Sequence, residues 1–161
     1  MTNTGIAFLK DKILELLYGS RDVEKAVNET LALLGEYFAV SRAYIFESNE
    51  DGKRCNNTFE WCNEGIEPCI ALLQNLSYHD DLDDTWPRVF NERGIFYCPD
   101  IHALEPNAKR VLEMQGIKGV LHCAILDNGE FKGFVGFDNC EEEEPAWMTD
   151  EPSVEALIYV S

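Results

Sequence analysis

Six cysteines and three histidines are the side chains in this sequence best suited to nucleophilic, redox or metal-binding chemistry. The cysteines occupy positions 55, 62, 69, 98, 123 and 140, and no two of them form the C-x-x-C pair that zinc sites normally use. A reactive thiolate needs a lowered pKa, which so acidic a chain does little to provide. We therefore interpret most cysteines as small apolar core residues and expect no metal site.

The histidines lack the neighbours of a catalytic or metal-binding site. His79 and His102 fall in expected loops, with no triad or ligand spacing around them. His122 and Cys123 fall within an expected strand, where neighbouring side chains point to opposite faces. His122 shares its face with apolar residues, which favours a histidine of the core or of a pocket wall over a reactive one.

Acidic residues dominate the charge of the chain. Thirty Asp and Glu against thirteen Lys and Arg give a formal net charge of −17, which disfavours binding to nucleic acid or to anionic membranes. The cluster from Asp80 to Asp84 lacks the glycine and the spaced oxygen ligands of a calcium loop. Together with the run from Glu141 to Glu144, it is interpreted as solvated loop.

Several aromatic residues suit the wall of a small-molecule pocket. Core packing explains each of them singly, but as a set they also fit a planar or apolar ligand, because such pockets are mostly apolar with a few placed polar groups. Arg42 and Asp100 are the polar groups expected to matter most. The full set of candidate ligand-binding residues is Arg42, Phe46, Phe59, Trp61, Trp86, Tyr97, Asp100, His122 and Cys123.

The whole chain, residues 1–161, has the length of one domain, and 45% hydrophobic residues are enough to fill one core. Its first residues lack the basic and apolar regions of a signal peptide, and no apolar run reaches the length of a membrane span. We therefore expect a cytoplasmic protein whose thiols are reduced.

Helices are expected at both ends of the chain. Apolar residues at three- and four-residue spacing predict a helix from Val23 to Phe38, with Ser20 or Asp22 as its cap. The preceding helix, within residues 1–19, is apolar on more than one side and is expected to meet a second subunit. Residues 149–161 predict a helix without a stop signal, which is interpreted as a connector to a downstream effector domain.

Strand patterns alternate with long connections in the middle of the chain. Residues 41–48 and 55–62 predict an antiparallel hairpin. The excursion over residues 63–94 is expected to contain short helices near 68–76 and 85–93 and to cover something, because long loops inside domains usually do. A short strand at 95–98 and a helix at 105–115 follow.

Residues 118–138 predict a second hairpin with a type I′ turn at Asn128-Gly129. Counting back from that turn gives a continuous register. Asp127 is predicted to pair with Glu130 next to the turn. The predicted pairs on one face of the hairpin are Leu126–Phe131, Ala124–Gly133, His122–Val135 and Val120–Phe137, and those on the other face are Cys123–Phe134 and Leu121–Gly136. Both faces are mostly apolar, so we expect an α+β fold whose antiparallel sheet is covered by helices on one face and by loops on the other.

This order of elements resembles that of GAF domains, the small-molecule-sensing modules of bacterial signalling proteins. The segments that carry the resemblance are 41–47 (SRAYIFE), 57–62 (NTFEWC), 97–101 (YCPDI), 115–118 (QGIK) and 131–138 (FKGFVGFD). They are similar to the type of GAF domain found in front of diguanylate cyclase or histidine kinase domains. The resemblance implies a pocket between the sheet and residues 63–115, and dimerisation through the terminal helices.

Two departures limit the ligands that the resemblance implies. The Asn-Lys-Phe-Asp-Glu signature of cyclic-nucleotide-binding members is absent, so cAMP and cGMP are not supported. In bilin-binding members the chromophore cysteine is usually followed by histidine, whereas His122-Cys123 has the reverse order, so a bilin is not supported either.

The expected function is therefore that of a non-catalytic sensor of an unidentified small molecule, acting as a homodimer on an effector domain in the same chain. Two alternatives stay open. One is an enzyme similar to free methionine-(R)-sulfoxide reductases, which would use Cys69, Cys98 or Cys123. The other is a dimerisation module without a ligand, whose pocket is filled by its own side chains.

Overall fold

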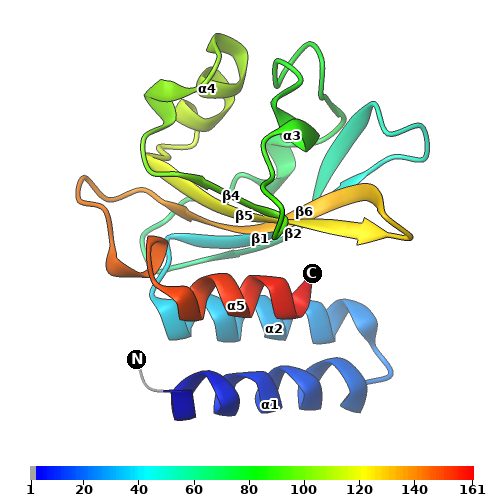
Figure 1. The fold of residues 1–161 in the computed structure, drawn as a ribbon, viewed down its shortest axis with the longest axis vertical. Coiled ribbons are helices and arrows are strands. Elements are labelled where there is room, and N and C mark those ends of the chain that lie inside the picture. The colour runs from blue at the N-terminus through cyan, green and yellow to red at the C-terminus, as the bar shows by residue number, and fades with distance from the viewer. Residues whose placement is uncertain (1–2) are drawn as a thin grey trace.

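The computed structural model describes residues 3–161, in which a six-stranded antiparallel sheet separates a helical layer from a lid of loops and short helices (Figure 1). The strands lie in the order β3-β2-β1-β6-β5-β4. Their bounds are β1 Arg42–Ser48, β2 Arg54–Cys62, β3 Leu76–Ser77, β4 Ile95–Cys98, β5 Gly119–Asp127 and β6 Glu130–Asn139. The helices are α1 Asn3–Gly19, α2 Val23–Phe38, α3 Thr85–Arg88, α4 Pro106–Glu113 and α5 Glu151–Val160. The expected α+β class is confirmed.

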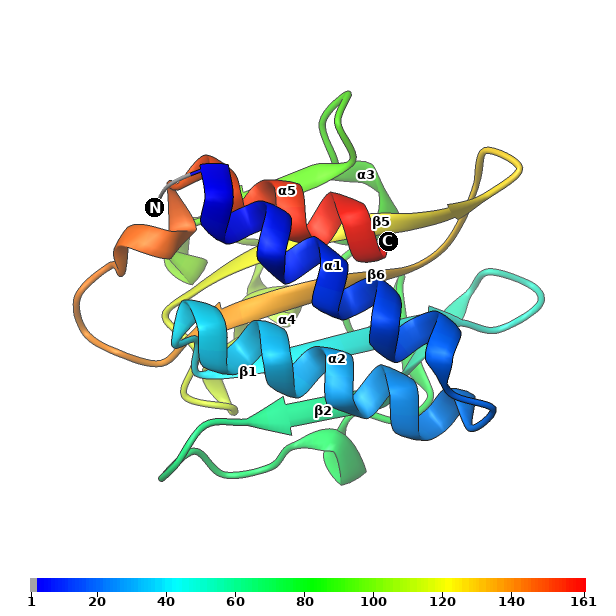
Figure 2. The same ribbon diagram turned by 90° about the horizontal axis from the view of Figure 1, so that it is seen from below.

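Helices α2 and α5 pack on the same face of the sheet, α2 on β1 and β2 and α5 on β5 and β6, and α1 lies across both as an outer layer (Figure 2). The apolar stripe of α2 is buried except at its start, where Val23 is exposed. Asp22 caps the helix as predicted by accepting a hydrogen bond from the backbone N–H of Lys25 at 3.0 Å. Gly35 on α2 lets the sheet approach closely, because a Cβ there would lie 2.1 Å from the Trp61 ring. Across residues 3–161, no helix combines the length and apolar content that a membrane crossing requires.

The lid covers the opposite face of the sheet, and carboxylates from the Asp80–Asp84 cluster hold it together. Asp83 accepts hydrogen bonds from the backbone N–H groups of Asn107 and Ala108 at the start of α4, at 2.7 and 2.8 Å. Asp84 contacts His79 at 2.6 Å. The cluster is thus not merely solvated loop, because Asp83 satisfies N–H groups that a helix N-terminus otherwise leaves unpaired.

Arg42 on β1 ties the lid to the sheet through a buried ion pair. Its guanidinium lies 3.0 Å from the Asp138 carboxylate, and both side chains are at most 3% exposed. The same guanidinium donates to the carbonyl oxygen of Glu67 at 2.9 Å and to that of Gln115 at 3.0 Å. Two stretches of the lid are therefore anchored to one side chain of the central sheet.

The predicted register of the second hairpin is correct at its turn and wrong beyond Leu126. Asp127 pairs with Glu130 and Leu126 with Phe131, but a bulge then places Ile125 opposite Gly133 and shifts every later pair by one residue. His122 consequently faces Gly136, not Val135. Gly133 has a φ of 150°, and a Cβ there would lie 2.0 Å from the Phe46 carbonyl oxygen, so a glycine is required at the bulge.

A second bulge changes which face the aromatic residues of β2 occupy. Ile45 pairs with Phe59 whereas Phe46 pairs with Asn57, which leaves Thr58 as the extra residue. Strict alternation would put Cys55, Phe59 and Trp61 on one face. Because of the bulge, Cys55 instead lies in the core beneath the lid, while Phe59 and Trp61 pack against the helical layer.

The expected short helices of the excursion are smaller than predicted. The first is a single 3₁₀ turn at Ile70–Leu72, and the second, α3, spans four residues. The chain between them forms β3 at the edge of the sheet, which the sequence pattern did not indicate. The remaining elements start or end within about three residues of their expected bounds, as is usual for boundaries read from pattern.

Candidate functional site

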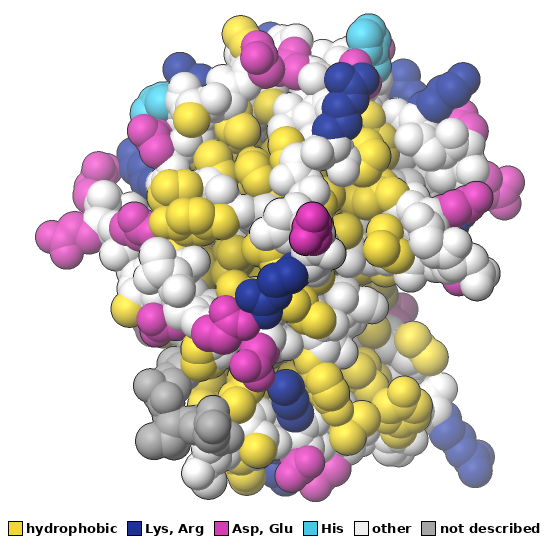
Figure 3. All heavy atoms as spheres, in the orientation of Figure 1, with side chains coloured by type: hydrophobic (Ala, Val, Ile, Leu, Met, Phe, Trp, Pro, Cys, Tyr) yellow, Lys and Arg dark blue, Asp and Glu magenta, His cyan; other side chains and the backbone are white. Residues whose placement is uncertain are grey.

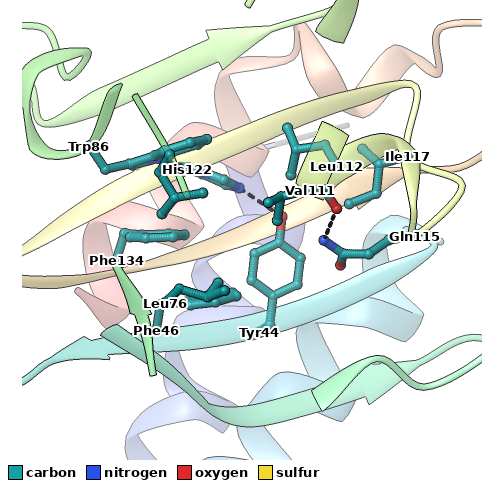
Figure 4. A pocket seen from close by; sticks show the side chains of 11 residues that line it. Tyr44, Phe46, Leu76, Trp86, Val111, Leu112, Gln115, Ile117, His122 and Phe134 are labelled. Carbon is teal, nitrogen blue, oxygen red and sulfur yellow. Dashed lines mark hydrogen bonds between the residues drawn. The ribbon is translucent and has the colours of Figure 1, made fainter. Parts of the chain in front are cut away.

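A small cavity lies between the central strands of the sheet and the lid (Figure 4). Its volume is about 30 Å³, which has room for one or two water molecules. Strands β1, β5 and β6 supply its floor, and α4 with the segments around β3 and α3 supplies its roof. The lining residues are Tyr44, Phe46, Leu76, Leu82, Trp86, Val111, Leu112, Gln115, Ile117, His122 and Phe134.

A stack of aromatic rings forms one wall of the cavity. The rings of Phe46 and Phe134 are nearly parallel, with centroids 4.8 Å apart. Phe134 in turn stacks on the His122 imidazole at 4.7 Å, and on the Trp86 indole at 5.8 Å. Gly136 makes this arrangement possible, because a Cβ at that position would lie 2.3 Å from the imidazole Cδ2.

Two hydrogen bonds fix the protonation of His122. The Trp86 indole N–H, which can only donate, points at His122 Nδ1 at 3.2 Å. Nδ1 must therefore carry the lone pair, and the proton of the neutral ring resides on Nε2, 2.7 Å from the Tyr44 hydroxyl oxygen. Burial lowers the pKa of His122 to about 3, so the imidazole is neutral near pH 7.

Tyr44 ends this chain of hydrogen bonds at the cavity. Its hydroxyl oxygen accepts from His122 Nε2–H, and the side chain is buried (Figure 4). Burial raises the pKa of the hydroxyl well above its ordinary value, so it keeps its proton. Tyr44 was not among the candidates expected from sequence, although period-two alternation along β1 places it on the same face as Arg42 and Phe46.

The structure brings together only some of the candidate residues named from sequence. Phe46, Trp86 and His122 line the cavity. Arg42 lies on the same face of the sheet but is used to anchor the lid. The other five candidates lie elsewhere: Phe59, Trp61 and Cys123 face the helical layer, and Tyr97 and Asp100 are exposed. Asp100 caps a 3₁₀ turn by accepting from the His102 N–H, and Tyr97 contacts Glu144.

The thiols proposed for the enzyme alternative do not converge on the cavity. Cys69 contacts the Arg42 guanidinium, Cys98 donates to the Asp100 carbonyl oxygen, and Cys123 belongs to the helix-side core. Burial raises the pKa of each of these thiols, which disfavours the thiolate. Among residues 3–161, no cluster of three or more His, Cys, Asp or Glu side chains is arranged to hold a metal ion.

An open cleft lies on the other side of Trp86. Its volume is about 470 Å³, and Lys53, Arg54 and Arg88 line it together with His79 and acidic residues of the lid. Trp86 borders both the cleft and the cavity, although it is only 2% exposed.

Comparison with known proteins establishes the family, since the model of the GAF domain matches residues 22–157. The chain belongs to the GAF domain family. It is 34% identical over 137 residues to the methanogenesis regulatory histidine kinase FilI of Methanothrix harundinacea (strain 6Ac). That match covers 83% of this chain but 15% of the relative, so the chain spans a small part of the relative's length.

Solved GAF domains share the fold at low sequence identity. The phycocyanobilin-bound GAF domain of a cyanobacterial phytochrome superposes with a TM-score of 0.72 at 15% identity, covering 96% of this chain and 88% of that one. The GAF domain of a phosphoenolpyruvate-protein phosphotransferase from Coxiella burnetii gives 0.71 at 14% identity, covering 99% and 94%. At such identities the similarity concerns the fold alone.

Proposed function

We propose that this GAF domain is a non-catalytic regulatory domain that senses a small molecule in the cavity between the sheet and the lid. The observation that carries the proposal is a buried site with an aromatic wall and one oriented hydrogen-bond chain, Trp86 to His122 to Tyr44. Apolar walls with a few placed polar groups are the usual composition of ligand sites. The similarity to a regulatory histidine kinase supports a role in signal transduction, with an effector domain in the same chain.

Ligand binding would act by moving the lid. The present cavity of about 30 Å³ is smaller than a metabolite, so a larger molecule has to displace the roof. Arg42 couples that displacement to the sheet, because its guanidinium holds the Glu67 and Gln115 carbonyls of the lid as well as Asp138 on β6. The helical layer packs on the far face of the same strands, where a change in the sheet can shift α2 and α5.

The outer helix offers a surface for a homodimer. Figure 3 shows apolar side chains gathered over the helical layer, at the bottom of the view. Leu14, Leu17 and Tyr18 of α1 share one helical face and are 42%, 36% and 82% exposed. Contiguous exposed apolar residues of this kind mark interaction surfaces. We therefore propose that α1 packs against α1 of a second copy.

The small cavity also favours a second candidate, a dimerisation module without a ligand. Ligand screening by thermal denaturation separates the two, because a compound that binds the folded state alone raises the melting temperature. We expect compounds that stabilise the wild type and not Leu112→Trp, which fills the cavity from α4. Leu72→Trp is the matched control, since Leu72 is 71% exposed and lies outside the cavity. If no compound distinguishes Leu112→Trp from Leu72→Trp, the ligand-free module is the better description.

A further inference from the structure

The hydrogen-bond chain that ends at Tyr44 has a direction, and this direction limits what can bind. Trp86 can only donate, so His122 Nδ1 accepts and His122 Nε2–H donates to the Tyr44 oxygen. The Tyr44 hydroxyl therefore acts as an acceptor in this hydrogen bond. Its own O–H donor has no acceptor, because among residues 3–161 the hydroxyl has no hydrogen-bond partner other than His122.

An unused donor at this place requires a partner. Tyr44 is 4% exposed and lines the cavity, where its hydroxyl lies between His122 and the α4 side chains of Val111 and Leu112 (Figure 4). A buried donor without an acceptor costs free energy, and a ligand that supplies the acceptor removes that cost. The position facing α4 should therefore hold an acceptor atom.

The rest of the lining excludes a charged ligand. None of the lining residues carries a formal charge when His122 is neutral. The nearby guanidinium of Arg42 is already paired with Asp138. The Gln115 amide is the other polar group at this end; it is uncharged, and its Nε2 donates one hydrogen bond to the Val111 carbonyl oxygen at 2.9 Å. Neutral donors such as the Tyr44 hydroxyl and the Gln115 amide do not compensate for burying an anion, and no lining carboxylate would accept a cation.

We infer that the ligand of this cavity is a neutral, largely apolar, planar molecule with a hydrogen-bond acceptor, such as a carbonyl oxygen, that accepts from the Tyr44 hydroxyl. This inference rests on the proposed function, since it names the class of molecule for the same cavity. The planar shape follows from the aromatic wall, where the rings of Phe46, Phe134 and Trp86 are within 17° of parallel in their stacked pairs. Space for the ligand arises when α4 moves outward, which leaves the Trp86–His122 hydrogen bond in place.

The test uses acetophenone and ethylbenzene, which have similar shapes and differ in the carbonyl group. Their affinities for the wild type and Tyr44→Phe are measured by NMR titration, with Leu112→Trp to locate binding in the cavity. We expect Tyr44→Phe to lower the affinity for acetophenone by about threefold to tenfold, which corresponds to the free energy of one hydrogen bond. The affinity for ethylbenzene should change by less than about twofold. Benzoate at pH 7, the anionic analogue, should bind far more weakly than acetophenone to the wild type.

Each other result overturns a defined part of the inference. If both probes bind in the cavity and Tyr44→Phe weakens them equally, or if benzoate binds as tightly as acetophenone, the ligand class is wrong while the proposed function stands. If neither probe binds in the cavity, the ligand class is wrong, and the proposed function is decided separately by the thermal-denaturation screen with Leu112→Trp and Leu72→Trp. The tautomer has its own readout, because ¹⁵N NMR of the imidazole distinguishes a proton on Nε2 from one on Nδ1. A proton on Nδ1 of His122 at pH 7 would contradict the inference without any ligand.

Discussion

At the scale of single residues, the site depends on a glycine and a histidine that face each other across two strands. Gly136 on β6 leaves room for the His122 imidazole on β5, and the ring then stacks on Phe134 and bonds both Trp86 and Tyr44. The sequence predicted His122 as a core or pocket-wall residue, which the structure confirms. The bonding partners were not predictable, because Trp86 comes from a lid whose path depends on contacts distant in sequence.

The buried histidine predicts a pH dependence of stability. The pKa of His122 falls from 6.5 to about 3 on folding, so between these values the unfolded chain binds a proton that the native protein does not. Stability from this residue is therefore present above pH 6.5 and is lost as the pH falls toward 3. In urea unfolding, the difference in free energy between wild type and His122→Gln should shrink by about 3 kcal/mol from pH 7 to pH 4.

Taking the difference in unfolding free energy between the wild type and His122→Gln cancels the contribution of the other titrating groups. Burial raises the pKa of Asp138, for example, but that carboxyl is present in both proteins. His102→Gln provides the matched control, because His102 is an exposed histidine of the lid. If the difference between wild type and His122→Gln stays constant with pH, the histidine is not held neutral by its surroundings.

At the scale of elements, the periodic patterns identified the main helices and strands, and local irregularities hid part of the site. The Asn128-Gly129 turn was read correctly, yet the bulge at Gly133 shifted the register beyond it by one residue. In β2 the bulge at Thr58 turned Phe59 and Trp61 away from the lid. A bulge inserts one residue without a distinctive sequence signal, so strict alternation misplaces every side chain that follows it.

The anchor between lid and sheet gives a prediction at this scale. Arg42→Met should lower the free energy of unfolding by about 3–5 kcal/mol, because it leaves Asp138 buried without its partner. Hydrogen exchange should quicken in α4, since the bond from Arg42 to the Gln115 carbonyl oxygen is lost. Both effects are measurable on the same protein, by urea unfolding and by mass spectrometry.

Two variants sharpen this test. Arg42→Met combined with Asp138→Leu removes both charges and should recover part of the lost stability. Arg54→Met is the matched control, because Arg54 donates to the Asn75 carbonyl oxygen on the exposed edge of the sheet, where ion pairs and hydrogen bonds contribute little. Equal losses for Arg42→Met and Arg54→Met would rule out a special role for the buried pair.

At the scale of the whole molecule, the sheet has two unlike faces, one against a layered set of helices and one against a lid with a cavity. That arrangement puts the cavity proposed to sense a ligand and the α1 surface proposed to contact a second copy on opposite sides of the sheet. The sequence indicated both faces through the apolar character of each face of β5 and β6. It did not indicate how nearly the lid fills its own cavity, because this depends on packing between segments far apart along the chain.

The proposed dimer predicts that charge on the outer helix separates the subunits. Leu14→Glu with Tyr18→Glu places two carboxylates on the exposed face of α1 without touching its buried side, which includes Leu9 and Ile13. Sedimentation velocity should show a dimer for the wild type and a monomer for this variant. Leu72→Glu, an equally polar change on the lid, should leave the dimer intact. A wild type that sediments as a monomer at every concentration would contradict the proposal.

The position of Trp86 gives the cavity an optical reporter of its own. The chain has three tryptophans, and the other two, Trp61 and Trp147, belong to the helix-side core. Replacing those two by phenylalanine would leave the fluorescence of Trp86 alone, which lines both the cavity and the cleft and is almost fully buried. Emission at short wavelength then reports an indole shielded from solvent, and a shift to longer wavelength reports that the lid has moved and exposed the indole to water.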